Sequence, residues 1–314
     1  MASASEQGGT HVQKAKPVWP RLAATTAAAA MAESLTFPID IVKTRLQLQG
    51  EMQKQASSNG AFRTAAAIIR QEGISGLYAG VSPAVARHIP YSGTRIMVFE
   101  SLRNSASPSA DSPLLATIAK MGMGLAAGAM GQFVAVPADL VKVRMQADGR
   151  LVAAGKIASP RYRGMTDALR KIVAHEGGIL ALWRGATPAI QRAALANLGE
   201  LATYDLAKQR VVDWGRLGDG SSLAVHGASS VCSGLMSAII STPADVVKTR
   251  MMNQGPDNPV YRGSLDCLLK AVRSEGVGGL YKGFFPTWAR LGPWQIAFWV
   301  SYEQLRVATG VGAF

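Results

Sequence analysis

The chain has 314 residues, of which 48% are hydrophobic and only 17% charged, yet its formal net charge is +13. Two cysteines and four scattered histidines exclude a disulfide framework and a metal centre rich in these residues. A basic excess suits nucleic acid, an anionic membrane surface or an anionic ligand, but here it is spread along the whole chain, so we expect no nucleic-acid partner.

Residues 1–16 form a polar tail that lacks the apolar core of a secretory signal and the arginines of an amphipathic transit peptide. We therefore expect any targeting information to be internal. Six long apolar helices follow in chain order, near residues 19–47, 79–103, 114–146, 182–209, 222–253 and 281–306. Three polar amphipathic links lie between the members of successive helix pairs, at 48–78, 147–181 and 253–280.

The first helix ends in "FPIDIVKTRLQ" (37–47), which returns as "VPADLVKVRMQ" (136–146) and "TPADVVKTRMM" (242–252). In each copy a proline bends the helix, and an acid and two bases follow within two turns. A second pattern, G-x2-P-x3-R-x11-[FY][DE]-x2-[RK], begins at Gly80, Gly185 and Gly283. Three coincident repeats divide the chain after its tail into units 17–110, 111–217 and 218–314.

Each long helix could cross a hydrocarbon core of roughly 30 Å. Small-residue runs such as "GMGLAAGAMG" would let helix backbones approach closely in a bilayer. Charged residues interrupt every helix, so a soluble helical bundle is the alternative. We favour an all-α membrane protein. The three links hold twelve Lys and Arg against two in the connections between units, which places the links on the positively charged side and both termini opposite.

Enzyme chemistry is not expected. "GMGLAAG" (122–128) has one residue too many for a dinucleotide fingerprint, and "GRLVAAGKI" (149–157) misses the P-loop spacing. No nucleophile and base, metal cluster or cofactor loop is recognisable in the sequence.

The triplicated P-x-D-x-x-K-x-R motif resembles the signature of the mitochondrial carrier family, over essentially the whole chain after the tail. Stretches such as "IQRAALANLGELATYDLAK" and "PWQIAFWVSYEQLR" are similar to its uncoupling-protein branch. The resemblance implies six tilted transmembrane helices from three repeats with short matrix helices, pseudo-threefold around a central cavity. It also implies the mitochondrial inner membrane, both termini in the intermembrane space, and a functional monomer.

The resemblance further implies two gates of ion pairs between neighbouring repeats. The matrix gate would pair Asp40 with Lys142, Asp139 with Lys248, and Asp245 with Lys43. In the alternate state a cytosolic gate would pair Glu100 with Arg306, Asp205 with Arg103, and Glu303 with Lys208. Gln47 and Gln146 match the family's glutamine brace, whereas Met252 takes the third position and predicts a weaker latch there. Buried ion pairs suit a switch because desolvation offsets much of their attraction.

One arginine recurs at the same position of the second long helix of each repeat, which we call the even helices: Arg87, Arg192 and Arg290. This position lies about 18 Å from the cytosolic gate, so the three arginines predict an anion site near the bilayer midplane. Pairing with carbonyl groups at the proline kinks is the alternative. Residues that break the threefold pattern should serve the substrate. In the uncoupling branch, an inhibitory purine nucleotide binds at positions that match the three arginines and at three further positions, which here are Arg95, Glu200 and Trp294. The residue found here at position 197, Asn197, also matches that branch.

Glu33 matches a helix-one acid that the branch ties to proton transfer, and a partly desolvated carboxyl suits that role. His88 could tune the site or simply pack. Aromatic-basic-glycine turns resemble the family's cardiolipin sites, and the residues are Gly80, Arg163, Gly164, Arg184, Gly185, Arg262, Gly263, Lys282 and Gly283. The first repeat departs from this pattern, with Ala79 in place of the base.

Three functions follow from these features. An uncoupling-type carrier would move protons, fatty-acid anions or other small anions, with fatty acid as activator. An obligate exchanger would move dicarboxylates, acidic amino acids or phosphate. A membrane scaffold with a vestigial cavity is the third, although it would need neither gate. We expect no resident cofactor or metal, with cardiolipin as bound lipid.

Overall fold

A computed structural model describes residues 18–48, 60–105, 113–153, 155, 157–213, 223–255 and 260–309. These residues contain helices and turns and no strand, which confirms the predicted all-helical class. The long helices are α1 (Val18–Gln47), α3 (Val81–Ala86) continued by α4 (His88–Ser105), α5 (Pro113–Ala153), α7 (Ala186–Asp213), α8 (Leu223–Asn253) and α10 (Phe284–Thr309).

Each link contains one short amphipathic helix followed by a 3-10 turn. The helices are α2 (Ala61–Glu72), α6 (Met165–His175) and α9 (Ser264–Glu275), and the turns are η1 (Ile74–Tyr78), η2 (Ile179–Trp183) and η3 (Val277–Tyr281). A glycine with positive φ separates each turn from the next long helix, with φ of 90° at Gly80, 81° at Gly185 and 87° at Gly283. Residues with a Cβ rarely adopt this conformation, so a glycine marks the end of each turn. The even helices begin only after it, a few residues later than the apolar pattern predicts.

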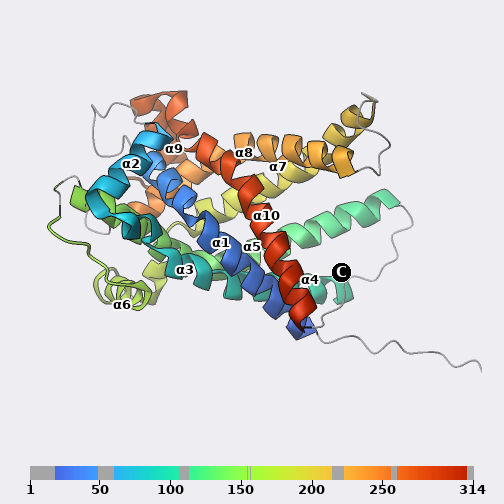
Figure 1. Ribbon diagram of the computed structural model, residues 1–314, viewed down its shortest axis with the longest axis horizontal. Helices are drawn as coiled ribbons and strands as arrows, with labels where there is room; N and C mark the ends of the chain where they lie inside the picture. Colours follow the sequence, from blue (N-terminus) through green and yellow to red (C-terminus); the bar gives the residue numbers. More distant parts are fainter. Residues whose placement is uncertain are drawn as a thin grey trace, which may run out of the picture.

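The long helices form a closed ring. The α4–α5, α7–α8 and α10–α1 contacts each join the second long helix of one repeat to the first long helix of the next. The first helices of the three repeats, α1, α5 and α8, also contact one another. In Figure 1 the short helices α2, α6 and α9 lie at the left end, and the start of α1 lies beside the end of α10 at the other.

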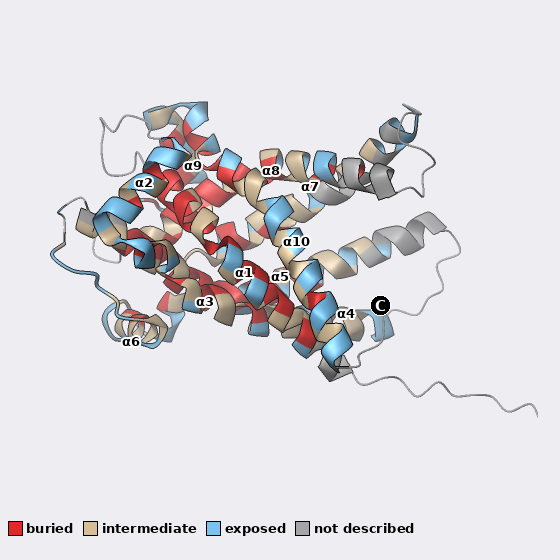
Figure 2. Cartoon of the chain, viewed as in Figure 1, coloured by how far each residue is buried: buried red, intermediate tan, exposed pale blue. Residues whose placement is uncertain are grey.

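Burial follows this arrangement. Figure 2 shows buried residues gathered where α1, α5 and α8 approach the short helices. Polar and charged side chains are numerous among them, including Glu33, Asp40, Asp139, Asp245 and Arg250. Among the described residues one segment, 121–149, is long and apolar enough to cross a membrane by length and composition. The six predicted spans are therefore not confirmed by this criterion.

Candidate functional site

Three ion pairs join the ends of α1, α5 and α8. Pro38, Pro137 and Pro243 lie inside these helices, and the acid and the lysine of each motif follow on the face turned toward the ring axis. Each lysine reaches the aspartate of another repeat. The Nζ–Oδ2 distances are 2.7 Å for Lys43–Asp245, 2.8 Å for Lys142–Asp40 and 2.6 Å for Lys248–Asp139. The structure thus brings together the three pairs predicted for the matrix gate.

Each of these aspartates also meets an arginine from the even helix on its other side. The Nε–Oδ1 distances are 3.0 Å for Arg290–Asp40, 3.5 Å for Arg87–Asp139 and 3.4 Å for Arg192–Asp245. The sequence suggested separate layers for the arginines and the gate, but the structure places both in one layer. The arginines contact carboxylates in the described part of the chain, rather than the kink carbonyls of the alternative reading.

We call these residues, together with Glu33, the central ion cluster: Glu33, Asp40, Lys43, Arg87, Asp139, Lys142, Arg192, Asp245, Lys248 and Arg290. They line a cavity of about 100 Å³. If all are ionised, six cations face four carboxylates, which leaves an excess of two positive charges. Such a cluster can attract an anion, because permanently charged guanidinium groups hold carboxylate and phosphate oxygens well.

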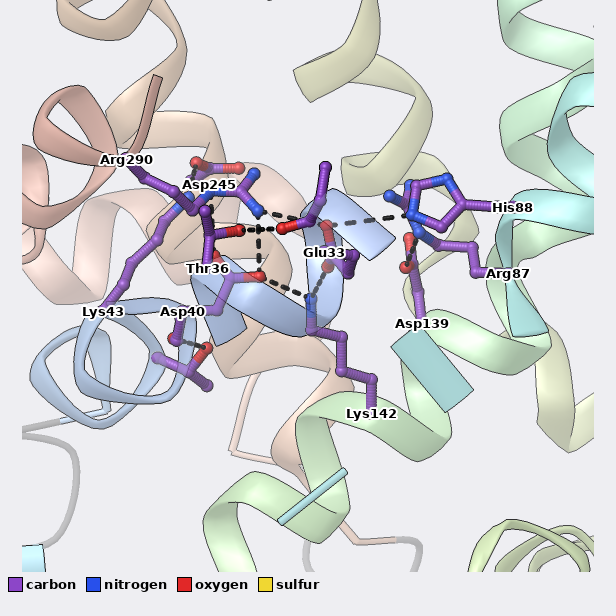
Figure 3. Close-up of polar contacts among 12 residues, drawn as sticks. Glu33, Thr36, Asp40, Lys43, Arg87, His88, Asp139, Lys142, Asp245 and Arg290 are labelled. Carbon is purple, nitrogen blue, oxygen red and sulfur yellow. Dashed lines mark hydrogen bonds and ion pairs between the residues drawn. The ribbon is translucent and has the colours of Figure 1, made fainter. Parts of the chain in front are cut away.

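Glu33 makes the cluster unequal. This fully buried carboxylate accepts hydrogen bonds from Lys142 Nζ at 2.8 Å and Arg290 Nη1 at 3.2 Å (Figure 3). Its counterpart in the second repeat, Gln132, donates to Asp139 Oδ2 at 2.8 Å, and the third repeat has Ala238. Glu33 therefore supports one of the three pairs with a charge, Gln132 supports another with a neutral group, and the last has no polar support at this position.

The two glutamines of the predicted brace make no hydrogen bond to the gate pairs in the described part of the chain. The Gln47 side-chain oxygen accepts a hydrogen bond from Thr249 at 2.8 Å, and neither side-chain atom of Gln146 has a partner among the described residues. Both side chains lie against the glycines that precede the even helices, at 3.1 Å from Gly283 and 3.5 Å from Gly80 when a Cβ is built there. Met252 likewise packs on Gly185 inside an apolar cluster, so this position supplies packing between repeats.

Among the described side chains, no ion pair joins the predicted cytosolic-gate residues of different repeats. Glu303 pairs with Arg306 one turn away on its own helix, and Arg103 is exposed. No ion pair of Glu100 occurs within the described residues, and the side chains of Asp205 and Lys208 lie outside them. Only one end of the ring is therefore closed by described ion pairs.

The nucleotide-site residues outside the central ion cluster are spread along the even helices. Arg95 is exposed, Asn197 lies beside Gly128 of α5, and the Glu200 side chain lies outside the described part. The Trp294 ring stacks on Phe298 with centroids 5.3 Å apart. No hydrogen bond or ion pair joins Arg95, Asn197 or Trp294 to the cluster within the described residues.

A second threefold set of ion pairs escaped the sequence analysis. The arginine that ends each P-x-D-x-x-K-x-R motif pairs with a glutamate of the link. The pairs are Arg45–Glu72, Arg144–Glu176 and Arg250–Glu275. In the sequence each glutamate lies twelve residues after a glycine, at Gly60, Gly164 and Gly263, and this threefold recurrence is the signal that could have revealed the pairs. Two of the arginines also donate to the next repeat, Arg144 to Met252 O and Arg250 to Gln47 O.

The basic residues of the predicted lipid sites fall into two groups. Arg184 and Lys282 pair with Glu176 and Glu275 at 3.1 and 2.6 Å, so they have a protein counter-ion already. Arg163 and Arg262 are exposed beside Gly164 and Gly263, and their backbone N–H groups donate to the first-turn acids of α6 and α9. The hydrogen bond from Lys270 lowers the pKa of Asp266 in that first turn, and Lys171 lowers the pKa of Asp167 in the same way.

Comparison with known proteins gives a consistent picture. The family model described as "Mitochondrial carrier protein" matches three times, at residues 14–109, 114–213 and 219–310. The chain is 50% identical to mitochondrial uncoupling protein 3 of Arabidopsis thaliana, over 97% of this chain and 99% of the relative. It is 40% identical to mitochondrial uncoupling protein 4C of Drosophila melanogaster, over 90% and 86%. It is 38% identical to kidney mitochondrial carrier protein 1 of Xenopus laevis, over 88% and 92%.

Proposed function

This chain belongs to the mitochondrial carrier family and is an uncoupling-type carrier rather than an enzyme, and from that premise we propose that it mediates regulated proton leak or small-anion transport by alternating access. Carriers of this family move small substrates or protons across the mitochondrial inner membrane. The observation that carries the proposal is the ring of lysine–aspartate pairs, which joins all three repeats at one end of the helix ring.

The ring acts as the matrix gate. It holds α1, α5 and α8 together, while Glu303 and Arg306 stay on one helix at the opposite end. Transport alternates between this state and one in which the matrix pairs separate and Glu100, Asp205 and Glu303 pair with basic residues of neighbouring repeats. Breaking buried pairs at one end is offset by forming pairs at the other, because both ends involve similar desolvation costs.

The central ion cluster binds the transported species. An anion entering the cavity competes with the aspartates for the arginines, which weakens the hold of the arginines on the gate acids. Glu33 is the carboxylate of the proton-binding site, because it is the one carboxylate of the cluster beyond those that the threefold gate uses. A proton bound at this site cancels the charge of Glu33 and frees Lys142 and Arg290 for an anion.

The remaining features complete the proposal. Six long helices cross the inner membrane, with α2, α6 and α9 on the matrix side and both termini in the intermembrane space. Cardiolipin binds at the exposed turns that include Arg163, Gly164, Arg262 and Gly263. A single chain closes the ring, so the monomer is the working unit. An inhibitory purine nucleotide would contact the cluster arginines and Trp294.

Obligate exchange of dicarboxylates, acidic amino acids or phosphate is the second candidate. The excess of two positive charges in the central ion cluster favours it, because that excess suits a dianion. A scaffold role is the weakest, and it would be revived if charge reversal at Asp139 left transport unchanged.

Reconstitution in cardiolipin-containing liposomes tests the proposal. We would measure proton flux with and without fatty acid and GDP, beside uptake of labelled aspartate, malate and phosphate against internal anion. GDP-sensitive, fatty-acid-dependent flux that falls about tenfold or more in Glu33→Gln is the expected result. The matched control is Asp213→Asn, the same acid-to-amide change at the exposed end of α7. Fast anion exchange with little proton flux would replace the uncoupling function by the exchanger.

A further inference from the structure

Two titratable side chains of the first repeat have no counterpart in the other repeats. One is Glu33, and the other is His88, which follows Arg87 directly; the residues that follow Arg192 and Arg290 are Ala193 and Leu291. The gate needs neither group, because its aspartates and lysines occur in all three repeats. A pair of groups that breaks the symmetry in this way serves the transported species rather than closure.

These two side chains face each other inside the protein. His88 begins α4 and is only 6% exposed, and its Nε2 atom lies 3.8 Å from Glu33 Oε2 (Figure 3). That distance is too long for a hydrogen bond, and Nε2 has no other hydrogen-bond partner among the described residues. A buried polar atom without a partner is costly, so an imidazole aimed at a carboxylate in this way calls for a functional reason.

In this state Glu33 is satisfied by other groups. Lys142 on α5 and Arg290 on α10 both contact its carboxylate, and Arg87 lies beside His88 while pairing with Asp139. Glu33 and His88 belong to one repeat, whereas Lys142 belongs to the next. Separation of the repeats as units would carry Lys142 away with α5 and leave Glu33 and His88 together, because α1 and α4 belong to one repeat.

We infer that Glu33 and His88 form a proton-binding pair that replaces Lys142 when the matrix gate opens. The neutral imidazole takes one proton from cavity water, and the resulting imidazolium donates from Nε2 to Glu33 Oε2. The pair changes from one negative charge to zero. In the leak direction the proton comes from intermembrane-side cavity water as Lys142 leaves. It is released to matrix water before the gate closes and Lys142 returns to Glu33, so each cycle carries one proton. This inference rests on the proposed function and names His88 as its further proton-binding residue.

The first test uses the full chain in liposomes. His88→Gln keeps a polar side chain of similar size but cannot take a proton at neutral pH. We expect proton flux at about pH 7 to fall about tenfold and to lose its dependence on pH between about 6 and 8. Anion uptake should stay within about twofold of the unmodified protein, since the arginines are untouched. The control is His175→Gln on the exposed end of α6. Unchanged flux with an unchanged pH profile in His88→Gln would overturn the inference.

The second test does not require transport. With only four histidines in the chain, ¹⁵N-histidine spectra of the purified protein report the charged fraction of His88, assigned by its loss in His88→Gln. Lys142→Gln imitates the departure of Lys142, and we expect the charged fraction to rise about threefold or more. Glu33→Gln added to Lys142→Gln should return it to the original value. An unchanged fraction in Lys142→Gln refutes the pair. Absence of proton flux in the unmodified protein, with the spectral change present, refutes the proposed function alone.

Discussion

At the scale of single residues, the glutamates that end or directly follow the short helices tie each link to its long helix. Glu275 ends the short helix α9, outside the proposed transmembrane helices, and is bound by Arg250 and Lys282. Burial raises the pKa of this carboxyl, but the hydrogen bonds from the two bases outweigh it and leave the pKa below its ordinary value of 4.5. The folded state therefore prefers the charged form, and the stabilisation is lost as pH falls.

We predict that Glu275→Gln lowers the unfolding temperature in detergent by about 3 °C at neutral pH. The difference from the unmodified protein should shrink as the pH is lowered through 4.5 and should vanish once the carboxyl is protonated in the folded protein as well. Thermal unfolding curves of both proteins at successive pH values measure it. A difference that stays constant down to pH 3 would mean that packing, and not charge, sets the contribution of Glu275.

The lysine–aspartate pairs were predictable because the motif recurs and a ring needs each repeat to meet the next. The arginine–aspartate contacts were not. A sequence gives distances along one helix, such as that from Arg87 to Glu100, but not how far a neighbouring helix is shifted along its axis. Arg87 and Asp139 come level only because α4 and α5 are offset in this way.

At the scale of helices, the small residues of α5 are not equivalent. A Cβ on Gly131 would lie 3.0 Å from the Tyr91 backbone oxygen of α4, whereas Gly122 and Gly124 face open space. The sequence predicted close helix contact from the whole run, but Gly124, which lies seven residues from Gly131 on nearly the same face, meets nothing within 4 Å. Composition reveals that small residues are present, but not at which level along the helix a neighbouring backbone comes close.

We predict that Gly131→Ala destabilises the protein by about 1–3 kcal/mol, because backbone atoms of α4 and α5 must move apart. Gly124→Ala on the same helix is the matched control and should be neutral or stabilising by up to about 1 kcal/mol, since alanine favours the helix. Thermal or denaturant unfolding in one detergent compares the two. Equal effects would show that α4 and α5 do not meet at Gly131.

At the scale of the whole molecule, the three repeats are joined at the closed end and must separate there for transport. Gln47 on α1 and Thr249 on α8 touch across this boundary at 2.8 Å. We predict that Gln47→Cys with Thr249→Cys, in a background with Cys232→Ser and Cys267→Ala, loses transport about tenfold or more after a short thiol cross-linker is added. A reducing agent that cleaves the linker should restore it.

The single-cysteine proteins treated with the same reagent are the controls, because they carry the modification without the bridge. Transport that survives complete cross-linking would exclude separation of α1 from α8 as a step of the cycle. The order of helices around the ring was predictable from the repeats. Which end of the ring is closed was not predictable, because both ends carry complementary charges in the sequence.

Each aspartate of the central ion cluster holds a lysine of one neighbouring repeat and an arginine of the other, so the contacts run around the molecule as a circle. A linear zipper has terminal links that open first and set its lifetime. A circle has no terminus, and no link can fray without straining the two beside it. Opening is therefore a concerted event, and a charge removed from any one repeat changes the lifetime of the whole closure.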